Sequence, residues 1–342
     1  MKPMRKALLP ITALLIPLII AVASAGSALA AGNAVRFCVT GDSRGSMTRR
    51  NGPVNKEVIS KMVAAIKKEK PDFVIFSGDL VLGYSKDLEK QLTLWRDSFM
   101  KPLLDAKIPV YACRGNHDQS LGGGKKSKGK KPEDIWNKVF SGKFAFPANG
   151  PSNARNMTYF VRKGNVLILV LDNYSGGKKG RNQVDVGWMK SVLAKETKKS
   201  PLPLHVFAMC HEPAFTVIHP DCLAVKAKQR DDFVKAFLKN GGVAFFCGHD
   251  HIYDHSQIKY PEGIFHQFVC GTAGAPLKKK WKGKYPDKRV RNVKTSVSFG
   301  YAVVDVKDSN ATITAKVWPG DKAKGSLKKI DALSYDLSEK GK

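Results

Sequence analysis

Beyond residue 30, the sequence contains no apolar run long enough to cross a bilayer as a helix. It also has no internal repeat and no linker long enough to separate two folded domains. These absences exclude a polytopic membrane protein, a repeat protein and a chain of well-separated domains. Acidic residues are scarce, with 29 Asp and Glu against 58 Lys and Arg. The whole sequence of 342 residues is 43% hydrophobic, and the length beyond residue 30 predicts one globular domain.

The first thirty residues have the organisation of an export signal. Lys2, Arg5 and Lys6 form a basic start, residues 7–25 are apolar, and Ala28-Leu29-Ala30 ends the stretch with small residues. We therefore expect residues 1–30 to be a signal peptide and the protein to be periplasmic or secreted, with no stable membrane span after cleavage. An uncleaved anchor is the alternative, because the apolar stretch is nearly long enough to span a bilayer.

Basic residues dominate the rest of the chain. Removing residues 1–30 takes away three basic residues and no acidic one, which leaves a formal charge of +26. Such an excess favours polyanionic partners, although it also serves plain solubility. Three glycine- and lysine-rich segments, 121–132, 175–181 and 277–291, are expected to be exposed loops. We predict that 121–132 and 277–291 contact polyanions.

Six cysteines in an exported protein would ordinarily suggest disulfides. Five of them each end an apolar run that has the character of a strand, and only Cys222 lies in a loop-like context. We therefore expect small buried thiols and at most one disulfide. The five are Cys38, Cys113, Cys210, Cys247 and Cys270.

Apolar β-branched runs alternate with helical patterns along the chain, and this alternation predicts an α/β layered fold. The runs indicate strands buried on both faces, at 34–40, 73–77, 109–113, 166–171, 204–210, 243–247 and 264–270. Helical apolar stripes are formed by Val58, Met62, Val63 and Ile66, and by Leu88, Leu92, Trp95, Phe99 and Leu103. Residues 301–306 and 312–318 predict a hairpin. Residues 319–342 are expected to be a polar tail.

Residues that can bind metals follow five of these strands, each on a turn. In chain order the turns are Gly41-Asp42-Ser43-Arg44, Gly78-Asp79, Gly115-Asn116-His117-Asp118, His211-Glu212-Pro213 and Gly248-His249-Asp250-His251. Glycine lets a turn bend sharply and lets the backbone approach a metal and a substrate closely. Carboxylate, amide and imidazole ligands together suit Mn, Fe, Zn or a similar ion. One such motif is weak evidence, but five in this order are a strong signal.

This series resembles the calcineurin-like metallophosphoesterase superfamily, which includes purple acid phosphatases and many phosphodiesterases. The family pattern runs D-x-H, G-D, G-N-H-[DE], a lone His and G-H-x-H, and the resemblance extends over residues 36–318. It implies a four-layer α-β-β-α sandwich, in which two mixed β-sheets pack face to face and helices flank them. The family domain is then expected at residues 34–318, with two divalent or trivalent metal ions at the strand ends.

The resemblance also implies the metal ligands. Asp79 would bridge the two ions, which are expected to be Fe, Mn or Zn. The other ligands would divide into one set for each ion. The first set is Asn116, His211 and His249, and the second is Asp42 and His251.

The implied reaction is in-line hydrolysis of a phosphate mono- or diester by a metal-activated hydroxide. His117, oriented by Asp118, would lie outside the ligand sets and face the substrate. It would protonate the leaving oxygen or stabilise its charge. No nucleophilic side chain is needed.

One position departs from the family pattern, because Arg44 stands where the family usually has histidine. A guanidinium cannot ligate a metal, since it stays protonated and has no free lone pair. Three interpretations follow. In the first, the Asp42 site binds its ion more weakly, and water takes the place of the missing ligand. In the second, Arg44 binds a substrate phosphate bidentately through its planar guanidinium. In the third, the ion is absent and Arg44 supplies its charge.

Two other functions compete with the phosphoesterase. One is a catalytically weakened member of the same fold that binds polyanions, which Arg44 favours and the intact metal ligands, together with His117, oppose. The other is a nuclease, which the charge favours, although Trp281 and Tyr285 are the only aromatics in the basic segments. Outside the motifs, His205 and His266 are expected in the core, and Asp172 as a turn residue.

Overall fold

The computed structural model describes residues 34–46, 52–85, 87–121, 131–175, 180–199, 204–279 and 283–339. The predicted signal peptide lies outside these ranges, as do 122–130, 176–179 and 280–282 of the three basic segments. Within the described part of the chain, no helix is long and apolar enough to cross a membrane.

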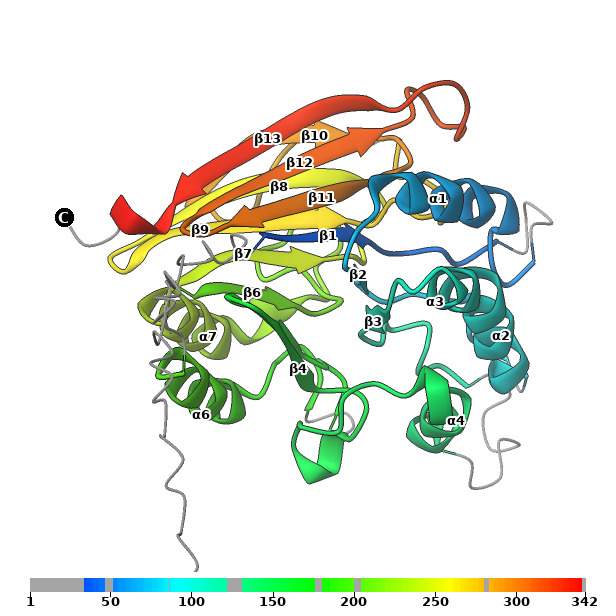
Figure 1. Cartoon of the computed structure of the whole chain (residues 1–342), viewed down its shortest axis with the longest axis horizontal. Coiled ribbons are helices and arrows are strands. Elements are labelled where there is room, and N and C mark those ends of the chain that lie inside the picture. The colour runs from blue at the N-terminus through cyan, green and yellow to red at the C-terminus, as the bar shows by residue number, and fades with distance from the viewer. Residues whose placement is uncertain are drawn as a thin grey trace, which may run out of the picture. The chain divides into compact units, whose positions relative to one another are not determined.

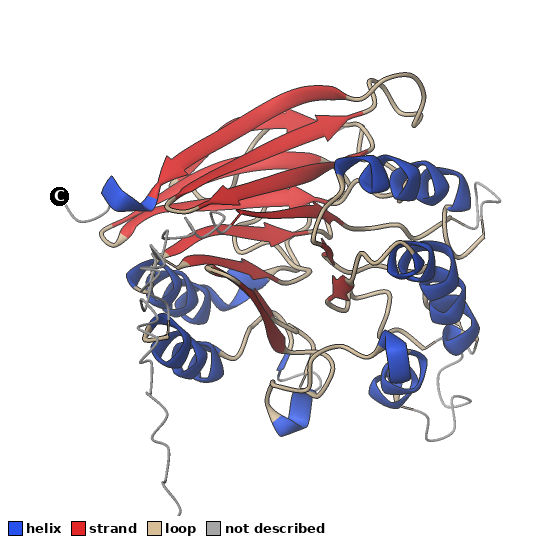
Figure 2. Cartoon of the chain, in the orientation of Figure 1, coloured by secondary structure: helices blue, strands red, loops and turns tan. Residues whose placement is uncertain are grey.

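Two mixed β-sheets form the centre of the domain, and helices lie outside them (Figure 1). The six-stranded sheet has the order β13-β12-β11-β1-β2-β3, and the seven-stranded sheet the order β10-β8-β9-β7-β6-β5-β4. Colouring by secondary structure separates the strands from the helices on either side (Figure 2). The four-layer sandwich predicted from the resemblance is therefore confirmed.

The elements of the first sheet are β1 (Ala34–Thr40), β2 (Phe73–Phe76), β3 (Val110–Ala112), β11 (Gly300–Lys307), β12 (Asn310–Val317) and β13 (Lys328–Asp336). Those of the second are β4 (Tyr159–Lys163), β5 (Val166–Val170), β6 (His205–Met209), β7 (Gly242–Cys247), β8 (Tyr253–Tyr260), β9 (Gly263–Cys270) and β10 (Val290–Ser296). The main helices are α1 (Lys56–Glu69), α2 (Leu88–Trp95), α3 (Lys101–Asp105), α4 (Pro132–Val139), α6 (Val186–Thr197) and α7 (Ala227–Lys239).

Strand β5 illustrates why the apolar runs are continuous. Val166, Ile168 and Val170 belong to the core that includes both inner sheet faces. Leu167 and Leu169 point the other way and pack in a second core with residues of α6 and α7. A strand with a buried surface on both sides needs apolar residues at every position, because successive side chains alternate between the faces.

Aromatic rings join the two sheets. Phe37 of β1 lies edge-on to Phe207 of β6, with ring centroids 5.3 Å apart, and to Phe246 of β7 at 6.4 Å. All three rings are fully buried. Edge-to-face pairs of this kind add specific attraction to the large area that each ring removes from water.

The helices follow the predicted stripes. In α1 the side chains of Val58, Met62, Val63 and Ile66 are buried. Asn55 caps the start of this helix by accepting a hydrogen bond from the Val58 N–H, and Lys70 ends it in the left-handed conformation. The second stripe is buried too and runs through α2, a π-helical turn (Arg96–Met100) and α3.

Some expectations held and others did not. All six cysteines are buried and free, and the predicted hairpin is formed by β11 and β12.

The structure extends the sheet beyond residue 318, because β13 pairs with β12 within the expected polar tail. Its partly buried Ile330, Leu333 and Tyr335 pack on the core. Asp172, expected as a turn residue, forms a buried ion pair with Arg114 at 2.8 Å.

Candidate metal centre

The five motif turns meet at one edge of the two sheets. Parallel strands β1, β2 and β3 of one sheet and β6 and β7 of the other deliver them there. Backbone hydrogen bonds connect the turns, from the Asp42 N–H to the Gly78 carbonyl and from the Gly248 N–H to the His211 carbonyl, both at 2.9 Å. Backbone hydrogen bonds alone therefore connect turns that are far apart in the sequence.

Three of the predicted ligands have a left-handed backbone. The φ angles are +59° at Asp42, +51° at Asp79 and +71° at His249. Side chains adopt this region at a cost of about 1–3 kcal/mol each, and such strain is concentrated at functional sites. The packed turns around these residues hold them in conformations that isolated loops would avoid.

The three donor atoms of the first predicted ligand set lie close together, and an oxygen of the shared Asp79 lies near one of them. Oδ1 of Asn116 is 3.1 Å from both Nε2 of His211 and Nδ1 of His249, and these two nitrogens are 3.3 Å apart. Oδ1 of Asp79 lies 3.4 Å from the same His211 nitrogen. Ligands at about 2.0–2.2 Å from one ion are separated from one another by about 3.0–3.5 Å. The spacing of Asn116, His211 and His249 thus fits a single metal ion, with Asp79 beside His211.

Hydrogen bonds on the far side of each imidazole fix which nitrogen faces the centre. Nδ1 of His211 donates to the Ser77 carbonyl at 2.8 Å, so Nε2 keeps its lone pair. Burial lowers the pKa of His211 to about 4, which keeps the ring neutral. Nε2 of His249 pairs with Asp221 at 3.2 Å and leaves Nδ1 for the centre. A carboxylate in this position makes an imidazole a more basic ligand.

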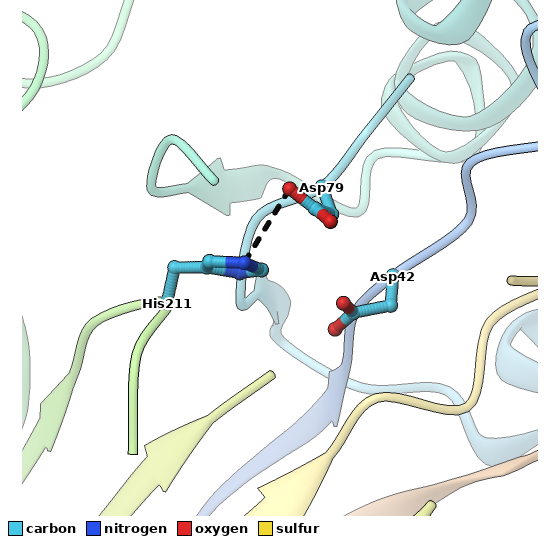
Figure 3. A group of neighbouring side chains, drawn as sticks. All are labelled: Asp42, Asp79 and His211. Atoms are coloured by element: carbon cyan, nitrogen blue, oxygen red, sulfur yellow. Dashed lines mark ion pairs between the residues drawn. The ribbon is translucent and has the colours of Figure 1, made fainter. Parts of the chain in front are cut away.

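The second predicted ligand set is less complete. Nε2 of His251 lies 3.6 Å from Oδ1 of Asp42, while Nδ1 of the same ring donates to the Pro276 carbonyl at 2.9 Å. Figure 3 shows Asp42, Asp79 and His211 directed into the same space, where their ligand atoms lie within 4.8 Å of one another. This second position therefore has only two predicted ligands, Asp42 and His251, besides the shared Asp79.

Two buried carboxylates side by side make the centre strongly attractive to cations. Burial, and then the charge of Asp79, raises the pKa of Asp42 well above its usual range. Burial acts in the same direction on Asp79, but His211, His117 and Arg44 together hold the pKa of that carboxyl below its usual value. Neighbouring acids cannot both ionise in a buried site without positive charge beside them.

Arg44 faces this pair of carboxylates. Its Nε lies 3.6 Å from Oδ2 of Asp79, and 18% of its side chain is exposed. The backbone is fixed there, because the Arg44 N–H donates to the Asp79 carbonyl at 3.2 Å and the residue forms a β-bridge with Val54. The Nε atom is buried and finds no hydrogen-bond acceptor among the described residues. The guanidinium therefore belongs to the centre and carries an unused donor.

His117 lies at the border of the centre. Its Nδ1 donates to the Leu82 carbonyl, and Nε2 lies 3.9 Å from Oδ2 of Asp79. Burial lowers the pKa of His117, and the charge of Arg44 acts in the same direction, whereas Asp79 opposes both. The imidazole is thus held in one orientation with Nε2 toward the carboxylates.

The expected contact between Asp118 and His117 is corrected by the structure. The Leu82 carbonyl, and not Asp118, orients the imidazole. Asp118 is buried, and its carboxylate accepts hydrogen bonds from the backbone N–H groups of Leu80, Val81 and Gly115. It therefore joins the turns after β2 and β3, and its influence on His117 is through the backbone.

Glycine is required at two of the turns by direct contact with ligand oxygens. A Cβ atom at Gly115 would lie 2.1 Å from Oδ1 of Asp79, and one at Gly248 would lie 2.1 Å from Oδ2 of Asp42. No real Cβ tolerates such a contact. These two positions let the main chain of one turn pass against the carboxylate of another.

Three nearby residues were not assigned by motif. Asp221 pairs with His249, as described, and the His219 ring has its centroid 4.8 Å from that of His249. Tyr84 is 60% exposed and lies edge-on to His117, with ring centroids 4.9 Å apart. Of these only His219 had a sequence signal, its position after a motif. His255, the other histidine in such a position, instead pairs with Asp331 of β13.

The family assignment agrees with this geometry. The sequence profile of the calcineurin-like phosphoesterase family matches residues 35–253, and the chain belongs to this family. Membership implies a binuclear metal site, and the Asp42, Asp79 and His211 cluster is a candidate for it. The first ligand set fits a metal ion, whereas the second contains an arginine beside two ligands and the shared carboxylate.

Solved structures share the fold. Purple acid phosphatase PPD1 from yellow lupin (Lupinus luteus) seeds superposes with a TM-score of 0.60 at 15% identity, over 89% of this chain and 54% of that chain. PhoD gives 0.61 at 12% identity, over 89% and 70%. GAP50, described as the anchor in the inner membrane complex of Plasmodium, gives 0.54 at 13% identity, over 87% and 89%.

At these identities the likeness establishes the fold alone. The chain spans about half the length of the lupin phosphatase chain. No curated protein sequence matches this one.

Proposed function

We propose that this protein is an exported metal-dependent phosphoesterase that hydrolyses phosphate mono- or diesters by direct attack of water on phosphorus. The observation that carries the proposal is the convergence of donor atoms from Asn116, His211 and His249 at 3.1–3.3 Å from one another, with Asp79 3.4 Å from His211. This mixture of donors suits Fe, Mn or Zn. Family membership supplies the class of reaction.

The residues of the centre divide the work of hydrolysis. A metal ion held by the first ligand set would supply Lewis acidity and lower the pKa of the attacking water. The Nε–H of Arg44 has no hydrogen-bond acceptor within the described part of the chain and can donate to a phosphate oxygen. As the bond from phosphorus to the leaving oxygen breaks, that oxygen needs a proton. Because the Leu82 carbonyl occupies Nδ1–H, His117 can deliver this proton only from Nε2 of its doubly protonated, cationic form, and the ring is neutral afterwards.

Basic residues beside the centre suit an anionic substrate. The N–H of Lys278, at the start of segment 277–291, donates to the His251 carbonyl at 3.2 Å. This bond anchors the segment next to the second ligand set. We propose that 277–291, together with 121–132, contacts the parts of a polyanionic substrate that extend beyond the reacting phosphate.

A purified, untagged protein consisting of residues 31–342 tests the activity. With Mn²⁺, Zn²⁺ or Fe²⁺ added, it is expected to hydrolyse p-nitrophenyl phosphate or its bis-ester, to lose turnover on dialysis against chelator and to regain it with metal. Asp79→Asn should abolish turnover, and Asp105→Asn, at an exposed aspartate on α3, should not. Turnover that survives complete metal removal would overturn the proposal.

Export is proposed from the composition of residues 1–30 and has its own test. Expressed with these residues in a bacterium, the protein is expected in the periplasm or medium, with an amino-terminal sequence that begins at Ala31. A cytoplasmic protein that retains Met1 would contradict it.

A polyanion-binding protein without catalysis is the second candidate, and Arg44 beside Asp79 is the observation that favours it. A GAP50 structure described as an anchor has the same fold. The same assay separates the candidates. A protein that binds metal and polyphosphate tightly but turns over neither ester would support the binding function.

A further inference from the structure

The two implied metal positions differ in what surrounds them. One has four predicted ligand side chains: the donor atoms of Asn116, His211 and His249 lie 3.1–3.3 Å from one another, and Asp79 lies 3.4 Å from His211. The other has Asp42 and His251, the shared Asp79, and a guanidinium that faces the shared carboxylate. We infer that this protein holds one metal ion, at the four-ligand position, and that Arg44 takes the place of the second cation and binds the phosphate group of the substrate. The inference rests on the proposed function and deepens it.

Arg44 cannot easily leave the second position. Its main chain is bonded to the Asp79 carbonyl and bridged to Val54. The next residue is held as well, since the Gly45 N–H donates to the Pro53 carbonyl at 3.0 Å. Because its backbone is anchored and most of its side chain is buried, Arg44 remains close to Asp79.

A fixed guanidinium disfavours a second ion at short range. A divalent ion held by Asp42, Asp79 and His251 would lie close to a permanent positive charge, and such repulsion is strong where solvent is largely excluded. Arginine stays protonated at any physiological pH and so cannot relieve the repulsion by losing its proton. It also fills space that a third ligand would need.

With one ion, the centre carries a small excess of positive charge. Asp42 and Asp79 carry two negative charges when both are ionised, and one divalent ion together with Arg44 supplies three positive charges. The resulting excess of one positive charge attracts an anionic phosphate without a second metal.

The hydrogen bonds of Arg44 point to the same ligand. Among the residues that the structure describes, Nε is buried without an acceptor, and Nη1 makes a long contact of 3.4 Å to the Gly45 carbonyl. Buried donors without partners are rare in proteins and call for an explanation. A guanidinium fork matches the oxygens of a phosphate, as it does those of a carboxylate.

Metal counting tests the first half of the inference. Untagged protein is incubated with excess Zn²⁺, desalted by gel filtration and analysed by inductively coupled plasma mass spectrometry. One zinc per chain is expected for wild type. Arg44→His removes the charge and adds an imidazole beside Asp42, so two are expected. Arg155→His changes an exposed arginine and should leave the count at one.

Phosphate binding tests the second half. Isothermal titration of zinc-loaded protein with inorganic phosphate is expected to show affinity about 10- to 100-fold weaker for Arg44→Gln than for wild type, because a charged hydrogen-bond donor is lost. Arg155→Gln should bind phosphate like wild type. Equal affinity of Arg44→Gln and wild type would overturn the phosphate-binding role.

The remaining outcomes also decide the matter. Two zinc ions in wild type, or one in an Arg44→His protein that melts like wild type, would overturn the replacement of the cation. If Arg44→His does not fold, Arg44→Lys keeps the charge and should still bind one ion, and two ions would contradict the inference. A protein with one zinc and weakened phosphate binding in Arg44→Gln, yet no ester turnover, would refute the proposed catalysis alone.

Discussion

Nε2 of His211 lies 3.4 Å from Oδ1 of Asp79, although the two residues follow strands of different sheets. Asp79 comes after β2 of the six-stranded sheet and His211 after β6 of the seven-stranded one. Their meeting places the candidate metal centre across the junction of the sheets. An ion bound to both side chains would therefore cross-link the two halves of the sandwich.

Metal binding should stabilise the fold for this reason. An ion that binds only the folded chain raises the free energy of unfolding by about 2.7 kcal/mol when its concentration is a hundred times its dissociation constant. Tm should therefore rise with Zn²⁺ concentration. Differential scanning fluorimetry of chelated and reloaded protein measures this. Asp79→Asn should melt at the same temperature with and without zinc, whereas Asp105→Asn should behave like wild type. A zinc-dependent rise in Asp79→Asn would place the ion elsewhere.

The glycine contacts provide a test of the geometry that needs no substrate. Gly115→Ala puts a methyl group against Oδ1 of Asp79, so the turns after β2 and β3 must separate. We expect a loss of about 1–3 kcal/mol in the free energy of unfolding, and zinc content well below wild type. Chemical denaturation and metal analysis measure the two effects.

Gly187→Ala is the matched control. A Cβ at Gly187 would meet nothing closer than 3.4 Å, and the position lies in the first turn of α6, where alanine is a better helix former. Wild-type zinc content and equal or greater stability are expected. Full zinc content in Gly115→Ala would show that the two turns can move apart without disturbing the ligands.

The buried ion pair of Arg114 and Asp172 predicts a pH dependence. Burial alone would raise the pKa of Asp172, but the charge and hydrogen bonds of Arg114 hold it below its usual value. The stabilisation is therefore present above the unfolded pKa of about 3.9 and is lost as pH falls through the folded pKa. Asp172→Asn should cost about 3–5 kcal/mol at pH 7, because a buried charge loses its main partner.

Denaturant titrations from pH 7 to pH 3 measure this effect. The difference in stability between wild type and Asp172→Asn should shrink as the pH is lowered. Asp305→Asn, at a surface ion pair with Arg36, should cost about 0–1 kcal/mol. A difference that stays constant with pH would mean that the charge of Asp172 does not stabilise the fold.

The sequence was most informative where chemistry and burial coincide. Asp42, Asp79 and His249 could be recognised as candidate ligands because each follows a strand that is apolar on both faces. Strand β13 was missed because it lies at the edge of its sheet, where Ile330 and Leu333 are only partly buried and stand among charged and polar residues without a regular alternation. An edge strand needs only one buried face, so its composition is close to that of a polar tail.

The orientation of His117 was missed for a different reason. Its partner is the Leu82 carbonyl. Every residue has a backbone carbonyl, so the identity of residue 82 does not indicate this hydrogen bond. Asp221 was missed because it belongs to a loop without a motif and is mostly exposed. Contacts of this kind depend on the conformation of loops in the folded protein, which motifs and hydrophobic patterns in the sequence do not predict.

His117→Ala tests the role of that imidazole. The variant should keep its metal, because His117 lies outside the ligand set, but lose about 10²–10⁴-fold in kcat, the usual contribution of a general acid. The loss should be small for p-nitrophenyl phosphate, whose leaving group needs little protonation, and large for an alkyl phosphate. Equal losses on both substrates, with unchanged zinc content, would assign His117 to positioning the substrate, since a group that only orients phosphate cannot distinguish the basicity of the departing oxygen.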